Sequence, residues 1–224
     1  MTTKIGLPFK KQYWFGQPFG NPAPMYTNLG LKAHNGCDFA CPTGTEIISV
    51  LDGVVEYAGE DTSAGKGVYV ISQLDGKSYR FIYWHFCEFR VSVGQQVKQG
   101  DVLGISDNTG LSTGPHLHFG MKPVELKNGW WQDTEHDNGF NGAIDPFSFL
   151  PSVLLPITIR KGMEGCWVSL IQTYMNKLNN ANLIVDGKYG VKTELAVKAF
   201  QSINGLKADG KFGSLSANKL LSLI

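Results

Sequence analysis

Residues 67–86, GVYVISQLDGKSYRFIYWHF, consist of two runs rich in β-branched and aromatic residues, joined by Asp75-Gly76. Such runs favour β-strands, and an Asp-Gly pair between two strands is typical of a tight hairpin turn. The stretch therefore predicts an antiparallel hairpin.

Shorter strands are predicted on both sides of this hairpin. TEIISVLDGVVEYAG (45–59) has the pattern of a strand, a turn at Asp52-Gly53 and a second strand. VSVGQQVKQGDVLGIS (91–106) predicts two further short strands around glycine turns, and PHLHFGMKP (115–123) predicts the last. Residues of about 45 to 125 should thus form a mainly antiparallel β assembly.

The segment that follows, residues 128–150, is rich in Gly, Asn and Asp and includes Trp130 and Trp131. We expect it to be a long surface loop that returns to the core. The paired tryptophans are candidates for one wall of a groove, although aromatic residues in loops more often serve to anchor the loop.

After about residue 150 the apolar residues recur at helical spacing, which predicts three short helices packed as a small all-α bundle. Between the helices the motifs DGKYG (186–190) and DGKFG (209–213) repeat 23 residues apart, each with an aromatic residue that can fill the bundle core. The expected domains are residues 1–150 and 151–224, joined by a short, stiff connection marked by prolines. The apolar positions are Leu170, Ile171, Tyr174, Met175, Leu178, Ala196, Ala199, Phe200, Ile203, Ala217, Leu220, Leu221 and Ile224, and the prolines are Pro146, Pro151 and Pro156.

The charge differs between these two parts. Residues 1–150 hold 11 Lys/Arg and 15 Asp/Glu, a balance of −4, whereas residues 151–224 hold 9 and 4, a balance of +5. The whole chain carries only +1, which gives no reason to expect a nucleic-acid partner. The smaller part is biased toward anionic surfaces.

Other sequence features limit the cellular setting. The first residues contain no apolar segment of the signal-peptide kind, and no apolar run reaches the length of a membrane span. We therefore expect synthesis in a cytoplasm and no insertion into a membrane. The four cysteines, Cys37, Cys41, Cys87 and Cys166, are expected to be free thiols, most of them buried, rather than a disulfide framework.

The histidines provide the first indication of chemistry. His116 and His118 would share one face of a strand, while Leu117 and Phe119 share the other. A surface strand with two solvated histidines is the plainer alternative. His34 stands four residues before Asp38, His85 ends the predicted strand, and His136 falls in the loop with the tryptophans.

Imidazole nitrogens and a carboxylate at short spacing suit zinc, and a catalytic zinc keeps three protein ligands and an open position. His34, Asp38 and one of the paired histidines supply such a trio. The remaining histidines are then available for proton transfer near neutral pH.

Three motifs together, HNGCDFA (34–40), YWHF (83–86) and STGPHLHFG (112–120), resemble the signatures of lysostaphin-like zinc metallo-endopeptidases. The resemblance covers most of residues 20 to 125. Members of this family cut the peptide cross-bridges of bacterial peptidoglycan. Residues 185–213 look like the three-helix peptidoglycan-binding module that is often attached to cell-wall hydrolases.

The resemblance implies roles for five residues. His34 and Asp38 match the family's first two zinc ligands, and His118 matches the third. His116 matches a catalytic histidine beside the metal, and His85 matches the second catalytic histidine. Which of these two is the general base stays open. Two positions fit less well. Cys37 stands where the family usually has a small apolar residue. Tyr26 could supply a transition-state hydroxyl group that some relatives use, but its spacing does not match securely, so it is not among the candidate residues.

The expected protein is thus a monomeric, zinc-dependent wall endopeptidase with one zinc per chain and peptidoglycan as its partner. A zinc-dependent wall amidase and a non-catalytic wall-binding relative are the alternatives. VGQQVKQGDVLG (93–104) also resembles half of a biotinyl or lipoyl carrier domain. A carrier would need an exposed modified lysine in its hairpin turn and no metal trio, and neither condition holds. Wall hydrolases without a leader resemble phage endolysins, which are made in the host cytoplasm and act on the wall after release; a trimmed secreted enzyme is the other possibility.

Overall fold

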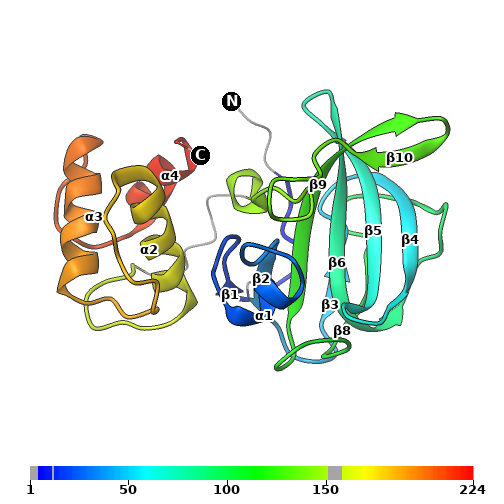
Figure 1. Ribbon diagram of the computed structural model, residues 1–224, viewed down its shortest axis with the longest axis horizontal. Coiled ribbons are helices and arrows are strands. Elements are labelled where there is room, and N and C mark those ends of the chain that lie inside the picture. The colour runs from blue at the N-terminus through cyan, green and yellow to red at the C-terminus, as the bar shows by residue number, and fades with distance from the viewer. Residues whose placement is uncertain (1–4, 12, 151–157, 224) are drawn as a thin grey trace.

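The computed structural model describes residues 5–11, 13–150 and 158–223. A β-rich part ends near residue 150, and three helices form a separate part beside it (Figure 1). The strands are β1 (Trp14–Gln17), β2 (Cys37–Ala40), β3 (Glu46–Ile48), β4 (Gly53–Asp61), β5 (Gly65–Leu74), β6 (Lys77–Phe89), β7 (Gln96–Val97), β8 (Val102–Ser106), β9 (Leu117–Lys127) and β10 (Trp130–Asp133). A short helix, α1 (Pro24–Asn28), and a 3₁₀ turn, η1 (Pro146–Phe149), complete this part.

The strands form an antiparallel sheet, in the order β1-β2-β9-β6-β5-β4-β7. In addition, β10 pairs with β9, and β8 pairs with β3 and with β6. The predicted mainly antiparallel fold is therefore confirmed. The central hairpin is β5–β6, and its turn has Asp75 and Gly76 at φ 49° and 76°.

One prediction in this region is wrong. The segment after residue 127 is not only a loop, because β10 pairs with β9 in a second hairpin. Its turn is Asn128-Gly129, with φ of 52° and 82°, and Asn-Gly is the pair that tolerates two such positive angles. Trp130 lies beside this turn and is 76% exposed.

One face of the sheet is the core of the β-rich part. Phe81, Tyr83 and Phe119 are fully buried there, and the rings of Phe81 and Phe119 are stacked 6.1 Å apart. The other face carries Trp84, whose ring lies against the backbone of Gly67. A Cβ at residue 67 would lie 2.0 Å from a ring carbon of Trp84, so only glycine permits this contact.

The C-terminal part contains the predicted three-helix bundle, with α2 (Cys166–Asn179), α3 (Val191–Ile203) and α4 (Ser214–Leu221). Tyr189 and Phe212, the aromatic residues of the two repeated motifs, are each only 2% exposed and fill its core as expected. We refer to this part as the helical module.

Two glutamines hold the repeated motifs of the helical module in the same way. Gln172 Nε2 donates to Asp186, to the carbonyl of Lys188 and to Thr193, and its Oε1 accepts from the amide of Gly187. Gln201 makes the equivalent four hydrogen bonds with the second motif, to Asp209, Lys211, Ser216 and Gly210. Each glutamine is 2% exposed and fixes an Asp-Gly turn to the start of the next helix.

The two parts are in contact. Helix α2 packs against β1 (Figure 1). The hydroxyl of Tyr174 in α2 donates to the carboxylate of Asp145, just before η1. The Tyr174 ring also lies 5.4 Å from that of Phe147. The predicted connection is outside the described residues, except that Pro146 begins η1.

We predict that Gln201→Leu destabilises the helical module by about 2–4 kcal/mol. The change leaves several buried groups without their partner, each at a cost of about 1–3 kcal/mol when isolated. Denaturant unfolding followed by circular dichroism measures this loss. Gln132→Leu, at an exposed position of β10, is the matched control and should shift the transition little; an equal shift in both variants would contradict the prediction.

Candidate functional site

Pairing of two neighbouring strands brings two of the three candidate metal ligands together. Asp38 in β2 lies directly opposite His118 in β9. His34, which comes just before β2, is 2% exposed, and its Nδ1 donates to the carbonyl of Pro18 at 3.0 Å. That hydrogen bond leaves Nε2 of His34 to face the other two side chains.

Three potential ligand atoms converge at this point. His34 Nε2 lies 3.0 Å from His118 Nδ1 and 3.1 Å from Asp38 Oδ1, and the last two atoms are 3.1 Å apart. Such separations fit three ligands of one small cation with bonds of about 2 Å, and two imidazoles with a carboxylate are a typical zinc donor set. Gly36 leaves the space for this arrangement, because a Cβ there would lie 2.6 Å from the His118 ring.

The electrostatics of the trio also favour a cation. Burial raises the pKa of Asp38, but the rings of His34 and His118 outweigh this effect and hold its pKa far below the usual range. Burial lowers the pKa of His118, and Asp38 offsets this only in part. For His34 burial likewise lowers the pKa, but the Asp38 carboxylate reverses the net shift and raises it. The cluster thus contains an ionised carboxylate in a mostly buried setting.

His116 lies beside the trio, just before β9 begins. Its Nδ1 is 2.8 Å from the carbonyl of Gly114 and 3.1 Å from Oγ of Ser112. A carbonyl can only accept, so Nδ1 carries the proton, and Nε2 is directed toward Asp38, 3.7 Å from its Oδ2. The second ring nitrogen of His116 is therefore available within the site.

His85 reaches the site through a β-bulge. The register between β5 and β6 shifts so that Lys66 pairs with Phe86 and Gly67 with Trp84, which leaves His85 as the extra residue. Its φ of 74° is unusual for a residue other than glycine. Bulges of this kind redirect a side chain, and here the imidazole of His85 lies 4.4 Å, centroid to centroid, from that of His116.

Backbone groups hold this second histidine. Nδ1 of His85 donates to the carbonyl of Thr109 at 2.7 Å. The amide of Asp107 donates to the carbonyl of His85, and the amide of His116 donates to the carbonyl of Asp107, so one residue connects both histidines. Burial, followed by the neighbouring His116, lowers the pKa of His85 to about 4, which keeps its imidazole neutral at pH 7.

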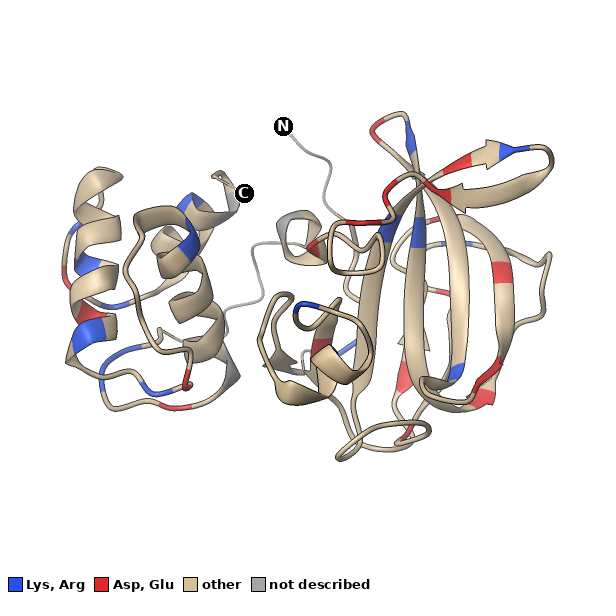
Figure 2. Cartoon of the chain, viewed as in Figure 1, with Lys and Arg blue, Asp and Glu red and all other residues tan. Residues whose placement is uncertain are grey.

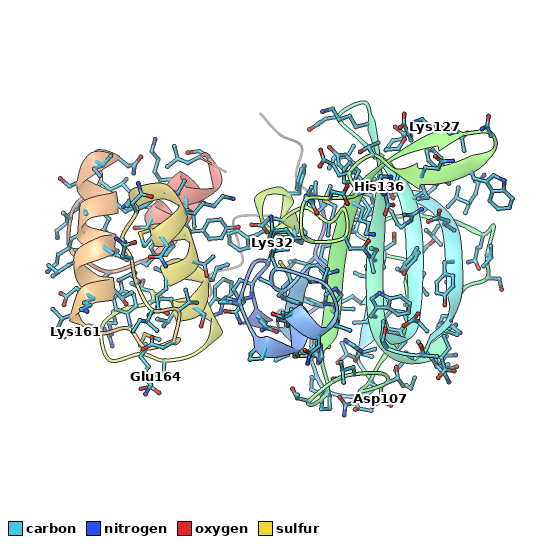
Figure 3. All side chains as sticks on the ribbon, viewed as in Figure 1. Lys32, Asp107, Lys127, His136, Lys161 and Glu164 are labelled. Carbon is cyan, nitrogen blue, oxygen red and sulfur yellow. The ribbon has the colours of Figure 1, made fainter. Side chains whose placement is uncertain are left out.

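All five residues chosen from the sequence line one cavity of about 740 Å³. Trp130 and Trp131 do not line it, so the described residues give no support for a tryptophan wall. His136, which the sequence left unassigned, does line it; Figure 3 labels His136 on the loop after β10 and Lys32 on the loop after α1, and the amide of Lys32 donates to Gly139 of the His136 loop.

Two further groups at the site, Tyr26 and Gln17, were not among the candidates chosen from the sequence. Tyr26 in α1 stacks on His34 with ring centroids 5.3 Å apart, and its hydroxyl donates to Gln17 at 2.7 Å. Both residues line the cavity. Burial, followed by the charge of Asp38, raises the pKa of Tyr26, so its hydroxyl stays protonated. The only sequence signal for Tyr26 was an uncertain spacing.

The cysteines are consistent with free thiols. Cys37 and Cys41 are buried and Cys87 is partly exposed, and none of the three is in a disulfide. Burial, with further contributions from nearby carboxylates, raises the pKa of Cys37 well above its usual value. Because that thiol stays protonated and lies on the core side of β2, Cys37 is a packing residue. The side chain of Cys166 is outside the described residues.

Comparisons with known proteins agree with this site. Residues 32–133 match the model of peptidase family M23, and residues 167–220 match a putative peptidoglycan binding domain. The glycyl-glycine endopeptidase ALE-1 of Staphylococcus capitis is 35% identical over 144 residues, which is 64% of this chain and 34% of that protein. The peptidoglycan DD-endopeptidase ShyA of Vibrio cholerae is 44% identical over 86 residues, or 38% and 19% of the two chains. The chain thus spans at most about a third of the length of these relatives.

Among solved structures, lysostaphin from Staphylococcus simulans has a TM-score of 0.50 and 27% identity, covering 69% of this chain and 62% of that one. The fold and site therefore define a metallopeptidase-like β domain with an appended helical module. The part of the chain that holds the site is thus similar to peptidase family M23, and the helical module is similar to a putative peptidoglycan binding domain. In the described residues, no helix has both the length and the apolar character needed to cross a membrane.

Proposed function

We propose that this protein is a monomeric, zinc-dependent endopeptidase that hydrolyses peptide bonds in the cross-links of bacterial peptidoglycan. One observation carries the proposal. Three ligand atoms about 3 Å apart and two backbone-held histidines meet in one cavity of an M23 domain, in a chain that also carries a peptidoglycan-binding domain.

His34, Asp38 and His118 would hold one zinc ion. Two imidazoles and a carboxylate fit zinc better than magnesium or calcium, which prefer oxygen ligands. When bound there, zinc would polarise the scissile carbonyl and lower the pKa of a water molecule toward about 7. The hydrogen bond from His34 to Pro18 fixes the ring nitrogen that faces the ion, as is usual for metal-bound histidines.

His116 and His85 would carry the protons. Each donates from Nδ1 to a backbone carbonyl, so each can accept a proton at Nε2. One would take a proton from water as general base, and the other would hold the oxyanion or return a proton to the leaving amine. Their roles could be exchanged without changing this geometry.

The cavity suits an extended peptide. A volume of about 740 Å³ has room for several residues, and its lining combines the histidines with Tyr26, Tyr69 and Trp84. Relatives named for a glycyl-glycine bond and for a DD bond both match the chain, so the bond cut here is left to experiment. A zinc-dependent wall amidase is the second candidate, because it would use the same metal chemistry.

The decisive experiment is digestion of purified walls from several bacteria, followed by mass spectrometry of the released fragments. We expect new peptide amino termini within cross-links, no release after treatment with a chelator, and recovery when zinc is added. A zinc ion in thousandfold excess over its Kd stabilises the folded state by about 4 kcal/mol, so chelation should also lower Tm. Fragments split only between glycan and peptide would instead identify an amidase.

Replacing His116 and His118 by alanine, one at a time, tests the different roles of these two histidines. His118→Ala should lose zinc, as measured by elemental analysis of the purified protein. His116→Ala should keep near-normal zinc, while turnover of a cross-bridge peptide falls by about a hundredfold or more, the usual scale for a lost acid-base group. The two variants are matched controls for each other. Zinc retained by His118→Ala, or lost by His116→Ala, would contradict the assignment.

The helical module should bind the wall, with charge as a contributor. Figure 2 shows Lys and Arg spread over its helices and loops, in keeping with the +5 balance of residues 151–224. We expect binding to purified peptidoglycan to weaken as added salt shortens the screening length below about 8 Å. Co-sedimentation in the His116→Ala background avoids degradation of the wall.

The matched variants for this prediction remove two positive charges each. Lys207→Gln with Lys211→Gln, both exposed in the helical module, should weaken co-sedimentation, whereas Lys77→Gln with Lys127→Gln, both exposed in the sheet, should not. Equal binding by both double variants at low salt would show that charge on the module does not contribute.

A further inference from the structure

The helical module contacts the sheet close to the candidate metal ligands. Helix α2 packs against β1, and β1 pairs with β2 (Figure 1), the strand that carries Asp38. In that pairing Gln17 lies opposite Asp38. A single strand therefore separates the helical module from a candidate zinc ligand.

The same contact also reaches the strand on the other side of β2. Tyr174 of α2 is 2% exposed, and its hydroxyl donates to Oδ2 of Asp145. The residue before Asp145 is fixed to β9, because the amide of Ile144 donates to the carbonyl of Met121 at 2.9 Å. Since β9 carries His118, the module bridges β1 and β9, with β2 held between them.

The packing around Tyr174 makes this bridge specific. Its ring contacts that of Phe147, and Oδ1 of Asp145 accepts from the amide of Phe147 at 2.9 Å. Each carboxylate oxygen of Asp145 therefore accepts a hydrogen bond, and together these bonds join helix α2, η1 and the sheet. Asp145 is half-buried, and burial raises the pKa of its carboxyl.

The far end of β1 reaches into the catalytic cavity. Gln17, its last residue, accepts the hydrogen bond from the hydroxyl of Tyr26, and Tyr26 stacks on His34. Both Gln17 and Tyr26 line the cavity. A shift of β1 would therefore displace Gln17, which belongs to the part of the cavity lining next to His34. It would also remove support from β2, the strand that carries Asp38.

We propose that Tyr174, a residue of the wall-binding module, is a positioning residue for the peptidase site: through Asp145 and the packing of α2 on β1 it fixes β1 and β2. This inference rests on the proposed function. The module then has two tasks, to bind the wall and to brace the catalytic groove. Loss of the brace should impair cleavage even of a small soluble peptide that makes no use of wall binding.

The test compares Tyr174→Phe with Tyr189→Phe in the full-length protein. The first removes the hydroxyl that donates to Asp145 and keeps the ring; the second removes a buried hydroxyl that donates to Gly210 at 2.9 Å within the module. Both lose one buried hydrogen bond, so both should lower Tm. Only Tyr174→Phe should lower kcat/KM for a soluble cross-bridge peptide, by about tenfold, well below its Tm. A misplacement of about 1 Å can cost up to a hundredfold.

A second readout does not depend on turnover. Because β2 carries Asp38, Tyr174→Phe should release zinc to a chelator several times faster than the native protein, and Tyr189→Phe should not. Asp145→Asn, alone and combined with Tyr174→Phe, completes a double-mutant cycle. If the two groups act as a pair, the combined loss in kcat/KM is smaller than the product of the single losses.

The outcomes separate this inference from the proposed function. If the native protein cleaves no wall peptide, the proposed function fails, while the zinc-release rates still decide whether Tyr174 braces β2. Identical kcat/KM and zinc release in Tyr174→Phe and Tyr189→Phe would overturn the inference. Strictly multiplicative effects in the cycle would exclude the Tyr174–Asp145 pair as its basis.

Discussion

The register between β2 and β9 is the constraint on which the site depends. It places Asp38 opposite His118 on one face and Cys37 opposite Phe119 on the other. A slip by one residue would exchange the faces, burying Asp38 in the core and turning Cys37 toward the cavity. Cys37 and Phe119 are fully buried, so the hydrophobic core itself determines that register. A polar trio is thus aligned by the apolar residues behind it.

The two remaining histidines depend on backbone geometry of a different kind. A bulge in β6 directs His85 into the cavity, and the main chain of Asp107 connects it to His116. Both imidazoles donate from Nδ1 to a backbone carbonyl, which leaves the second ring nitrogen of each to accept, whereas the metal trio contains an ionised carboxylate. The site therefore combines a charged trio that suits a cation with two histidines whose second ring nitrogens suit proton transfer.

The sequence identified the five residues that meet in the cavity better than the groove around them. The strands were recognisable from their β-branched runs and Asp-Gly turns, and the five candidate residues from short-range motifs. The β9–β10 hairpin was missed although Asn128-Gly129 carried its signal, because the surrounding Gly, Asn and Asp residues suggested a loop. The contact of Tyr26 with Gln17 could not be predicted, since it depends on where β1 packs rather than on any periodic pattern. Tyr174 had the helical spacing of a core residue, and spacing does not tell which partner covers such a residue.

The contact made by Tyr174 bears on how the two parts of the protein act together. A module on a flexible tether raises the effective concentration of substrate at the groove in many orientations. Here α2 packs on β1 and Tyr174 donates to Asp145, and these contacts hold the helical module and the groove in the relative orientation that the structure shows. Under the proposed function, a wall strand held by the module would present only those cross-links that reach the cavity in that orientation. Selectivity on intact walls would follow from this fixed geometry as well as from the cavity lining, whereas a free peptide would report the cavity alone.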